Sequence, residues 1–375
     1  MALTRAFLNS IRYGETTGGI NQTNKTPIVI NGDMQVQQRG DQTGVSSAQY
    51  VNADRFFINA DSLGAYTFAA STDTPGFGFS KSMKIDCTTS DGSPASGDSL
   101  YLSMQTEGQN IQMMRKGTAS AKTSTVAFWV KSNKTGNFTC ELWDRTNDRS
   151  VGKLVNIASA NTWEKKIVNF PADTTGAIAN DTARSIMLSW FLDCGSDFKG
   201  GTLNTTWASR SDTNRAVGNT LAIGSSTDNE FIITGVQWEM GTFDSETMPP
   251  FQFEDISTSL MRCYRYFYKD LSNAPYSVFG SGFQGGSTIG HVVMNFPTTM
   301  RALPTMASSG AGDFQLIIGS SKNVTGIAFD GNSRSLNNCR VDCTVSTGGL
   351  TPTGGGTILR AYNDATAFIT AEAEL

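Results

Sequence analysis

Short runs in which apolar and polar residues alternate recur along most of this 375-residue chain. They include KSMKID (81–86), TVAFWVK (125–131) and FIITGVQWE (231–239). These runs are rich in β-branched and aromatic residues, and Gly, Asn, Asp, Ser and Thr fill the connections between them. They follow one another too closely for βαβ units. The pattern therefore predicts an antiparallel jelly-roll β-sandwich over residues 27–253.

A methionine and two prolines at residues 248–250 interrupt the strand pattern, and the one convincing helical periodicity follows them. It predicts a short linker helix at residues 254–272. Two interpretations remain open, because the helix can pack on its own domain or form an interface near a symmetry axis. Its apolar stripe consists of Leu260, Tyr264, Phe267 and Leu271, and the first three are candidates for contacts between subunits.

Strand-like runs resume after Pro275, and paired or tripled glycines separate them. Residues 273–375 are therefore predicted to form a second, small β-sandwich. No strict internal repeat of 20–50 residues is present in the sequence. The absence of such a repeat argues against a solenoid or a parallel β-helix.

The N-terminal segment predicts an arm at residues 1–26 that attaches to another subunit or to a larger particle. A polar, Gly-, Thr- and Asn-rich stretch at residues 14–25 follows a short amphipathic pattern. A frayed terminus is the alternative. The segment lacks the apolar run of a secretory signal, and no stretch of the chain is long and apolar enough to predict a membrane span. The candidate attachment residues are Leu3, Phe7, Leu8 and Ile11.

Charge and composition narrow the classes of function. The chain has 29 Lys and Arg against 33 Asp and Glu, a net charge of −4, so it lacks the basic excess expected of a nucleic-acid-binding surface. His291 is its one histidine, which argues against His-based triads and multi-His metal sites. Nucleotide-binding and hydrolase motifs are also absent from the sequence. We therefore expect a binding or structural protein that is not an enzyme and needs no cofactor and no metal.

Two kinds of site built from carboxylates stay open at this point. Glycoside hydrolysis needs two carboxylates that face each other across a cleft, and oxygen-ligated calcium needs several oxygens in one loop region. Turn formation or an exposed charge explains each acidic side chain more simply. The residues considered are Asp144, Asp193, Asp197 and Glu239.

The six cysteines form no C-x-x-C pair, so they indicate buried free thiols rather than a zinc site. A bridge between Cys339 and Cys343 across a tight loop is left open.

Aromatic side chains offer a better indication of binding. An exposed tryptophan ring can stack on the apolar face of a sugar ring. Trp129 and Trp143 can share one face of a sheet, although a place in the core is the alternative for each tryptophan. The candidates for contact with a glycan or another receptor are Trp143, Trp190 and Trp207.

Several segments in a fixed order resemble bacteriophage tail-fibre and appendage proteins that combine a carbohydrate-binding-module-like jelly roll with a small C-terminal β-sandwich. The resemblance covers about residues 28–375, and no single motif is specific by itself. The matching segments are NGDMQVQQRG (31–40), ADRF (53–56), AFWVKSN (127–133), TWEKKIVNFPADTT (162–175), ITGVQWEMGTF (233–243), PPFQFEDISTSLMRCYRYFYK (249–269), FPTTMRALPTM (296–306) and AFITAEAEL (367–375).

The resemblance implies a virion protein of the tail-fibre or spike type, assembled in the host cytoplasm as a homotrimer. It implies binding to a host-surface glycan or protein, and attachment to other tail or capsid proteins through the arm. It carries no catalytic residues over to this chain. The missing coiled coil and shaft repeat favour a short appendage. A purely structural virion subunit (head fibre, capsid decoration, collar or tail adaptor) and a capsule-degrading glycoside hydrolase are the alternatives.

Overall fold

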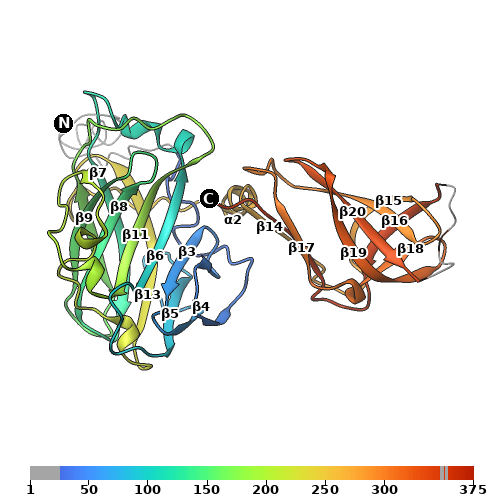
Figure 1. Ribbon diagram of the computed structural model, residues 1–375, viewed down its shortest axis with the longest axis horizontal. Helices are drawn as coiled ribbons and strands as arrows, with labels where there is room; N and C mark the ends of the chain where they lie inside the picture. Colours follow the sequence, from blue (N-terminus) through green and yellow to red (C-terminus); the bar gives the residue numbers. More distant parts are fainter. Residues whose placement is uncertain (1–25, 347–349, 351–353) are drawn as a thin grey trace, which may run out of the picture. The chain divides into compact units, whose positions relative to one another are not determined.

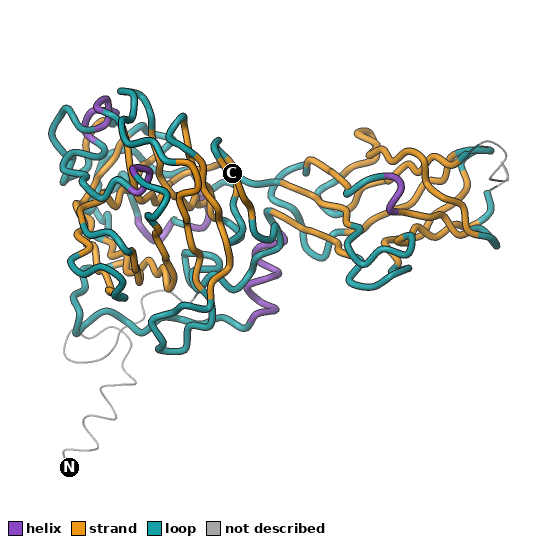
Figure 2. The backbone as a smooth tube through the Cα atoms, turned by 90° about the horizontal axis from the view of Figure 1, so that it is seen from below, coloured by secondary structure: helices purple, strands orange, loops and turns teal. Residues whose placement is uncertain are grey.

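The computed structural model describes residues 26–346, 350 and 354–375, which divide into two compact units. Unit 1 contains the described residues up to Ile256 together with Leu375, and unit 2 spans Ser257–Glu374. Strands dominate both units, and the strand pairs are antiparallel (Figures 1 and 2). The predicted mainly β fold is thereby confirmed.

Unit 1 is a sandwich of two antiparallel sheets that enclose one apolar core. The six-stranded sheet has the order β1 (Gln42–Val45), β4 (Ala65–Ser71), β5 (Ser82–Thr89), β13 (Glu230–Met240), β7 (Ser124–Ser132) and β10 (Glu164–Phe170). The seven-stranded sheet has the order β12 (Ala208–Ser209), β9 (Arg149–Ile157), β8 (Gly136–Asp144), β11 (Arg184–Cys194), β6 (Ser99–Glu107), β3 (Phe56–Asp61) and β2 (Gln49–Tyr50). Short 3-10 helices interrupt the loops: η1 (Gly108–Asn110), η2 (Gln112–Met114), η3 (Ser196–Phe198), η4 (Asp212–Asn214) and η5 (Ile223–Ser225).

Alternation along each strand decides which side chains form this core. On β7, Val126, Phe128 and Val130 are fully buried between the sheets, whereas Trp129 and Lys131 lie on the outer face. The ring of Phe128 meets the ring of Trp190 on β11 edge-on, with 5.6 Å between their centroids. Such aromatic pairs across the two inner faces join the sheets over their apolar surfaces.

A β-bulge in β13 brings two distant segments together. The register with β7 shifts between Thr234 and Gln237, and Gly235 between them has a φ of +63°. A Cβ at Gly235 would lie 2.7 Å from Cζ of Phe79 and 3.0 Å from Cδ1 of Trp129. Glycine is therefore required here, both for its backbone conformation and for the close approach of these two rings.

A buried ammonium group holds the loops at one end of unit 1. Nζ of Lys116 lies 2.6 Å from Oδ2 of Asp144 and 3.0 Å from Oδ2 of Asp173. It also donates hydrogen bonds to the carbonyl oxygens of Thr175 at 2.9 Å and Gly176 at 3.0 Å. The Lys116 side chain is 1% exposed, so water cannot reach its charge. The four oxygens take the place of that water as hydrogen-bond partners. An ammonium group here holds the type of oxygen set that a calcium ion would use.

Unit 2 combines a helix, a small sheet and a closed barrel. Helix α2 spans Ile256–Tyr264, and β14 (Phe267–Leu271), β22 (Phe368–Glu372) and β17 (Thr305–Ser308) form a three-stranded sheet. The barrel has the order β15 (Val278–Gln284), β16 (Ile289–Asn295), β20 (Asn338–Val345), β19 (Ser321–Arg334), β18 (Phe314–Ile317) and β21 (Gly356–Ala361), and η6 (Ala311–Asp313) precedes β18. Alternation predicts strands with one buried face, and it does not distinguish two stacked sheets from a sheet that closes on itself.

The helix is shorter than residues 254–272, and its predicted apolar stripe does not exist. The chain leaves the helix after Tyr264, and Phe267 begins β14, which pairs with β22. The buried helical residues are Ser259 and Cys263, whereas Leu260 and Tyr264 are half-buried. Residues 264–268 (YRYFY) are rich in aromatic side chains that favour a strand, and this preference ends the helix early. Leu260, Tyr264 and Phe267 therefore do not form one helical face.

The cysteines and the histidine have structural surroundings. All six cysteines are free and buried. Cys339 and Cys343 are four residues apart on the extended strand β20, or ~13 Å along it, which is too far for a disulfide. Nδ1 of His291 lies 2.6 Å from Oδ1 of Asp342 on the neighbouring strand. Among the described residues, no helix is long and apolar enough to cross a membrane.

Replacing Lys116 by methionine is expected to destabilise unit 1 by about 3–5 kcal/mol, because Asp144 then remains buried without a counter-charge and Asp173 keeps only its ion pair with Arg149. Thermal unfolding monitored by circular dichroism measures the effect. Lys122→Met is the matched control, since Lys122 is exposed and its replacement should change stability by less than ~0.5 kcal/mol. Equal melting temperatures for the two variants would contradict the structural role of Lys116.

Asp270 gives unit 2 a pH-dependent stability. Burial raises the pKa of this carboxyl to about 6, and a hydrogen bond with Tyr268 offsets part of the rise. A raised carboxyl pKa means that the folded state holds its proton more tightly than the unfolded state, so stability is full below about pH 4 and is lost as the pH rises through 6.

Asp270→Asn is therefore expected to stabilise unit 2 at pH 7 by about 1–2 kcal/mol, a figure reduced for the partial exposure of the group. Melting temperatures at pH 4.5 and pH 7 test this. The gain should be smaller at pH 4.5 than at pH 7. A gain equal at both pH values would contradict the assignment.

Candidate functional site

The structure gives Trp190 no access to a ligand. Its ring is fully buried between the sheets, near Phe56 and Phe128. The candidate is therefore wrong as a receptor contact. The reason lies in the alternation of β11, because Trp190 shares the parity of Ile186 and Leu188, which also face the core.

Trp143 and Trp207 lie outside the middle of the core, but other side chains cover them. The ring of Trp207 is 8% exposed, with the ammonium of Lys116 5.0 Å from its centroid. The ring of Trp143 is 9% exposed, and guanidinium carbons of Arg145 and Arg210 lie 3.8 Å and 4.0 Å from its centroid. Neither indole offers an open face on which a sugar ring could stack.

An open aromatic surface occurs instead on the outer face of the six-stranded sheet. Phe77, from the loop between β4 and β5, stacks on Trp129 of β7 with 5.2 Å between ring centroids and 19° between ring planes. Phe77 is 76% exposed, the highest value among the large apolar side chains of the described residues. We call this pair the aromatic platform.

The backbone under Phe77 adopts a conformation that bulky residues rarely take. Its φ is +53°, and those of its neighbours Gly76 and Gly78 are +81° and +91°. A left-handed conformation at a non-glycine residue costs of order 1–3 kcal/mol and persists where the surroundings impose it. The strain places a large apolar ring in solvent, so the loop loses stability on two counts without a gain for the core. This combination is typical of a functional surface.

A second group of rings supports the loop. Phe79 lies 5.0 Å from both Phe251 and Phe253, and those two rings lie 4.8 Å apart, all measured between centroids. A Cβ at Gly78 would approach the ring of Phe253 to 3.2 Å. The loop that carries Phe77 is therefore fixed by packing on its inner side.

Polar groups border the platform. Oδ1 of Asp73 accepts a hydrogen bond from Nε1 of Trp163 at 2.9 Å, and Oδ2 of Asp73 accepts one from Nζ of Lys131 at 2.7 Å. Burial by itself would raise the pKa of Asp73, but these two bonds outweigh it and lower the pKa. Lys165 of β10 lies directly opposite Trp129 in the strand register, so its side chain emerges beside the platform.

The platform therefore combines an apolar plane with charged hydrogen-bonding groups at its rim. The C–H face of a pyranose packs against an aromatic plane, while carboxylate, ammonium and indole N–H groups bond to the ring's hydroxyls. The site is a surface rather than an enclosed pocket. Such a surface suits one or a few units of a longer saccharide better than a small ligand that needs enclosure.

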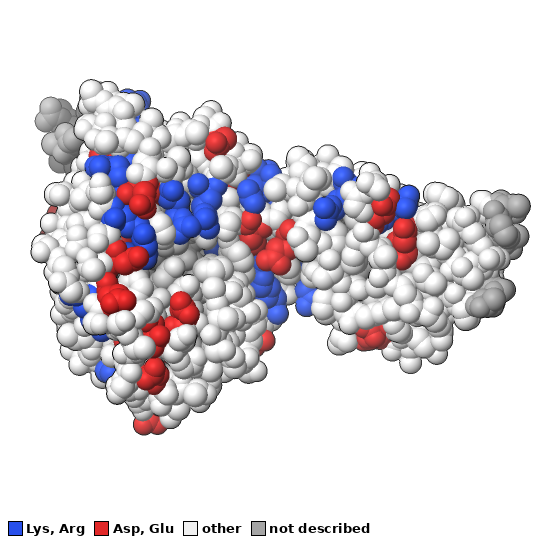
Figure 3. Space-filling model, viewed as in Figure 1, with Lys and Arg blue, Asp and Glu red and all other residues white. Residues whose placement is uncertain are grey.

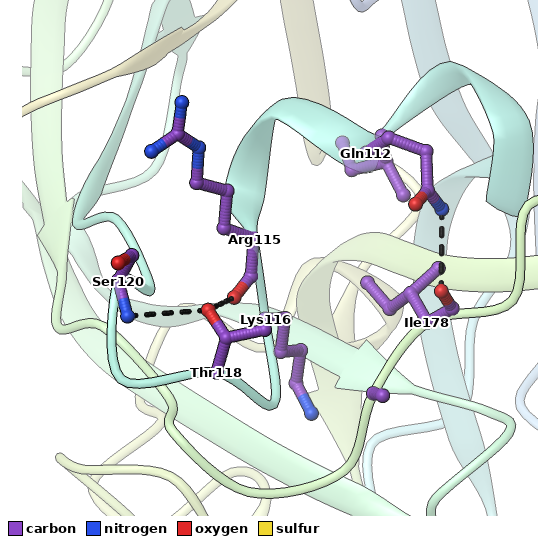
Figure 4. Close-up of a pocket in the computed structure, with 8 residues that line it drawn as sticks. Gln112, Arg115, Lys116, Thr118, Ser120 and Ile178 are labelled. Atoms are coloured by element: carbon purple, nitrogen blue, oxygen red, sulfur yellow. Dashed lines mark hydrogen bonds between the residues drawn. The ribbon is translucent and has the colours of Figure 1, made fainter.

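A recess of about 420 Å³ lies elsewhere in unit 1, between η2 and residues 177–178 (Figure 4). Nε2 of Gln112 donates to the carbonyl oxygens of Gly108 and Ile178, and Oγ1 of Thr118 donates to that of Arg115. These polar groups are thus already engaged with the walls of the recess, which makes it a weaker candidate than the platform.

The acidic residues considered from the sequence do not converge on an open cleft. Asp144 is buried with Lys116, and Glu239 is 1% exposed. Asp193 is also buried; burial raises its pKa, and its Oδ2 accepts a hydrogen bond from the amide of Gly224 at 3.1 Å. Asp197 is exposed on η3. Within the described residues, no group of three His, Cys, Asp or Glu side chains is placed to hold a metal ion.

Sequence reasoning missed Phe77 and underused Trp129. Two signals were available. Trp129 has the opposite parity to Val126, Phe128 and Val130 along the strand. If those three side chains face the core, Trp129 must point to the outer face of the sheet. In PGFGF (75–79), glycines on both sides of a phenylalanine mark a turn that presents the ring. The candidate arm residues Leu3, Phe7, Leu8 and Ile11 lie outside the described residues.

No protein-family model and no curated protein matches this chain. Solved structures do match, among them the enzymatically active domain of bacteriophage CBA120 tailspike protein 4, with 12% identity, a TM-score of 0.29, and coverage of 57% of this chain and 21% of that chain.

A family 11 carbohydrate-binding module from Clostridium thermocellum, in complex with a β-1,3-1,4-mixed-linked tetrasaccharide, matches with 8% identity and a TM-score of 0.26 over 55% of this chain and 98% of that chain. The CBM22-1 xylan-binding domain from Paenibacillus barcinonensis Xyn10C matches with 5% identity and a TM-score of 0.27 over 58% and 97%. At these identities and TM-scores, the matches assign no family to this chain.

Proposed function

We propose that this protein binds a cell-surface glycan through the aromatic platform of unit 1 and acts by contact, without catalysis. The single observation that carries the proposal is the stack of Phe77 on Trp129, with Phe77 76% exposed on a strained backbone. A ring held in this way is preorganised, so a ligand gains contact area with little loss of side-chain freedom. The rim formed by Asp73, Lys131 and Trp163 supplies the hydrogen bonds that fix a sugar's orientation.

The wider role that we propose is an appendage of a bacteriophage virion that contacts the host surface, as the sequence resemblance implies. In that role unit 1 presents the platform, and residues 1–26 attach the protein to other tail or capsid proteins. The proposed assembly is a homotrimer. A purely structural virion subunit is the alternative, and it predicts no glycan binding at the platform.

Strand edges do not by themselves require an oligomer. In unit 1, β2 and β12 at the edges of one sheet are two residues long, and β10 at an edge of the other carries Lys165 and Lys166. Short or lysine-bearing edges resist pairing with another sheet, and the barrel of unit 2 closes on itself.

The support for association comes from a face of the barrel instead. Three neighbouring strands, β21, β15 and β16, expose apolar side chains at 40–62% of their surface. In the register, Ile358 and Val293 both lie opposite Ser281, so they flank it on the same outer face. A second copy of this chain is the occupant that we propose for this face, whose exposed residues are Val278, Phe283, Val293 and Ile358.

Phe77→Ala and Trp129→Ala are each expected to weaken glycan binding by roughly 5–10-fold or more, because each removes part of the stacking surface. A glycan array with the full-length chain identifies the ligand. Calorimetric titration then measures the change in affinity for both variants, and tryptophan fluorescence can also be used for Phe77→Ala. Tyr362→Ala, which removes a 42% exposed ring from unit 2, is the control and should bind like the parent. Absence of any glycan ligand would leave the structural-subunit alternative.

Val293→Lys is expected to lower the mass of the assembly in size-exclusion chromatography with light scattering. The substitution puts a charge in the middle of the apolar face of the barrel, where it should prevent contact between copies. Thr325→Lys is the control, because it adds the same charge at an exposed position of β19. A monomeric parent chain at micromolar concentration would refute the trimer.

A further inference from the structure

Four arginines gather on the outer face of the seven-stranded sheet, away from the aromatic platform, and we call them the arginine cluster. Figure 3 shows basic side chains concentrated over the part of unit 1 where Figure 1 labels β8 and β11. The cluster draws on three segments: the turn after β8, the start of β11, and residues 195–222, which cover part of the sheet. Its members are Arg145, Arg184, Arg210 and Arg215.

Trp143 lies at the centre of the cluster. The guanidinium carbons of Arg145, Arg210 and Arg215 lie 3.8, 4.0 and 4.8 Å from its ring centroid. At these distances the guanidinium groups of Arg145 and Arg210 make cation–π contacts with the indole. These contacts fix the orientation of both groups while their N–H edges remain able to bond.

Two members of the cluster have an evident structural purpose. Arg215 forms a two-pronged ion pair with Glu141, with Nη2–Oε2 at 2.8 Å and Nε–Oε1 at 3.1 Å, and both side chains are buried. Asp212 contacts Arg210 and Arg215. These pairs hold residues 195–222 against the sheet, and they account for the charges of Arg210 and Arg215.

Arg145 and Arg184 have no such explanation. Neither forms an ion pair with a carboxylate of the described residues. The nearby carboxylate of Asp148 instead accepts a hydrogen bond from Nε1 of Trp143 at 3.2 Å. Partial burial and the neighbouring guanidinium groups, Arg184 first among them, lower the pKa of Arg145. Gathering uncompensated cations raises the free energy of the folded chain, and an anion between them would lower it.

We infer that the arginine cluster is a second binding site, which takes the carboxylate or phosphate group of an acidic glycan. Arginine presents paired N–H donors that match two oxygens of a carboxylate or a phosphate, and partial burial strengthens such bonds. A nucleic acid is the less suitable ligand, because its affinity depends on many phosphate contacts along a basic track, and the chain has a net charge of −4. The site lies on the opposite sheet from the platform, so the two are tested separately.

Affinity electrophoresis and calorimetry with the full-length chain test the inference. The probes are polygalacturonate for carboxylate, phosphomannan for phosphate, and neutral dextran as a control, each at 20 and 150 mM NaCl. We expect binding to one or both acidic polymers that weakens with salt, and no binding to dextran at this site. Preference for one acidic polymer identifies which anion the cluster takes.

The variant Arg145→Ala/Arg184→Ala should weaken that binding at least 10-fold and reduce its dependence on salt. Lys122→Ala/Lys322→Ala is the matched control, because it removes the same charge from positions outside the cluster and should keep the binding. Melting temperatures establish that both variants fold. If the arginine variant fails to fold, Arg145→Gln alone, which keeps much of the side chain's bulk, replaces it.

Three outcomes would overturn the inference: no binding to either acidic polymer, equal loss in the lysine control, or tighter binding of a single-stranded oligonucleotide through the same arginines. Phe77→Ala should leave binding of the acidic polymers intact. If Phe77→Ala loses binding of its glycan ligand while the arginine variant keeps its binding of the acidic polymers, the platform stands and the cluster is overturned. If the arginine variant loses acidic-polymer binding while Phe77→Ala binds its glycan like the parent, the cluster stands and the platform is overturned.

Discussion

Burial of every second side chain between two sheets is the constraint on which unit 1 depends. Once Val126, Phe128 and Val130 fill the core, the pleat of β7 leaves Trp129 outside, and the same rule places Trp143 outside on β8. Each outward ring then has a different environment. Trp129 stacks with Phe77 and stays partly open, whereas guanidinium groups cover Trp143. The two candidate surfaces thus arise from one rule applied to opposite sheets.

Polar contacts hold the loops that have no ladder of backbone hydrogen bonds. Lys116 joins the end of β8 to the connection between β10 and β11 through one ammonium group, and Arg215 joins residues 195–222 to Glu141. Buried pairs of this kind add little net stability compared with apolar packing, but removal of one partner is costly. They therefore act mainly to specify where each loop lies. That precision matters for the binding role that we propose for this surface.

The strands were readable from the sequence because alternation is a local property, whereas the sites depend on what covers a side chain. Trp190 could have been assigned to the core from its parity with Ile186 and Leu188, and that reasoning was available. Nothing local indicates that Arg145 and Arg210 cover Trp143, since Arg210 lies far along the chain. The helix prediction failed where aromatic residues at 264–268 favour strand pairing with a segment about a hundred residues away. Closure of the barrel is likewise a property of all its strands together.

The left-handed backbone at Phe77 sets stability against the recognition that we propose for this position. Glycine or asparagine would occupy that conformation with less strain, so selection for a sturdier fold alone would remove the ring. Because the tip of this turn makes no contribution to the core, exchanging its side chain changes the surface without disturbing the sandwich. If the platform binds as we propose, residue 77 is therefore a place where specificity can change quickly while the architecture around it stays the same.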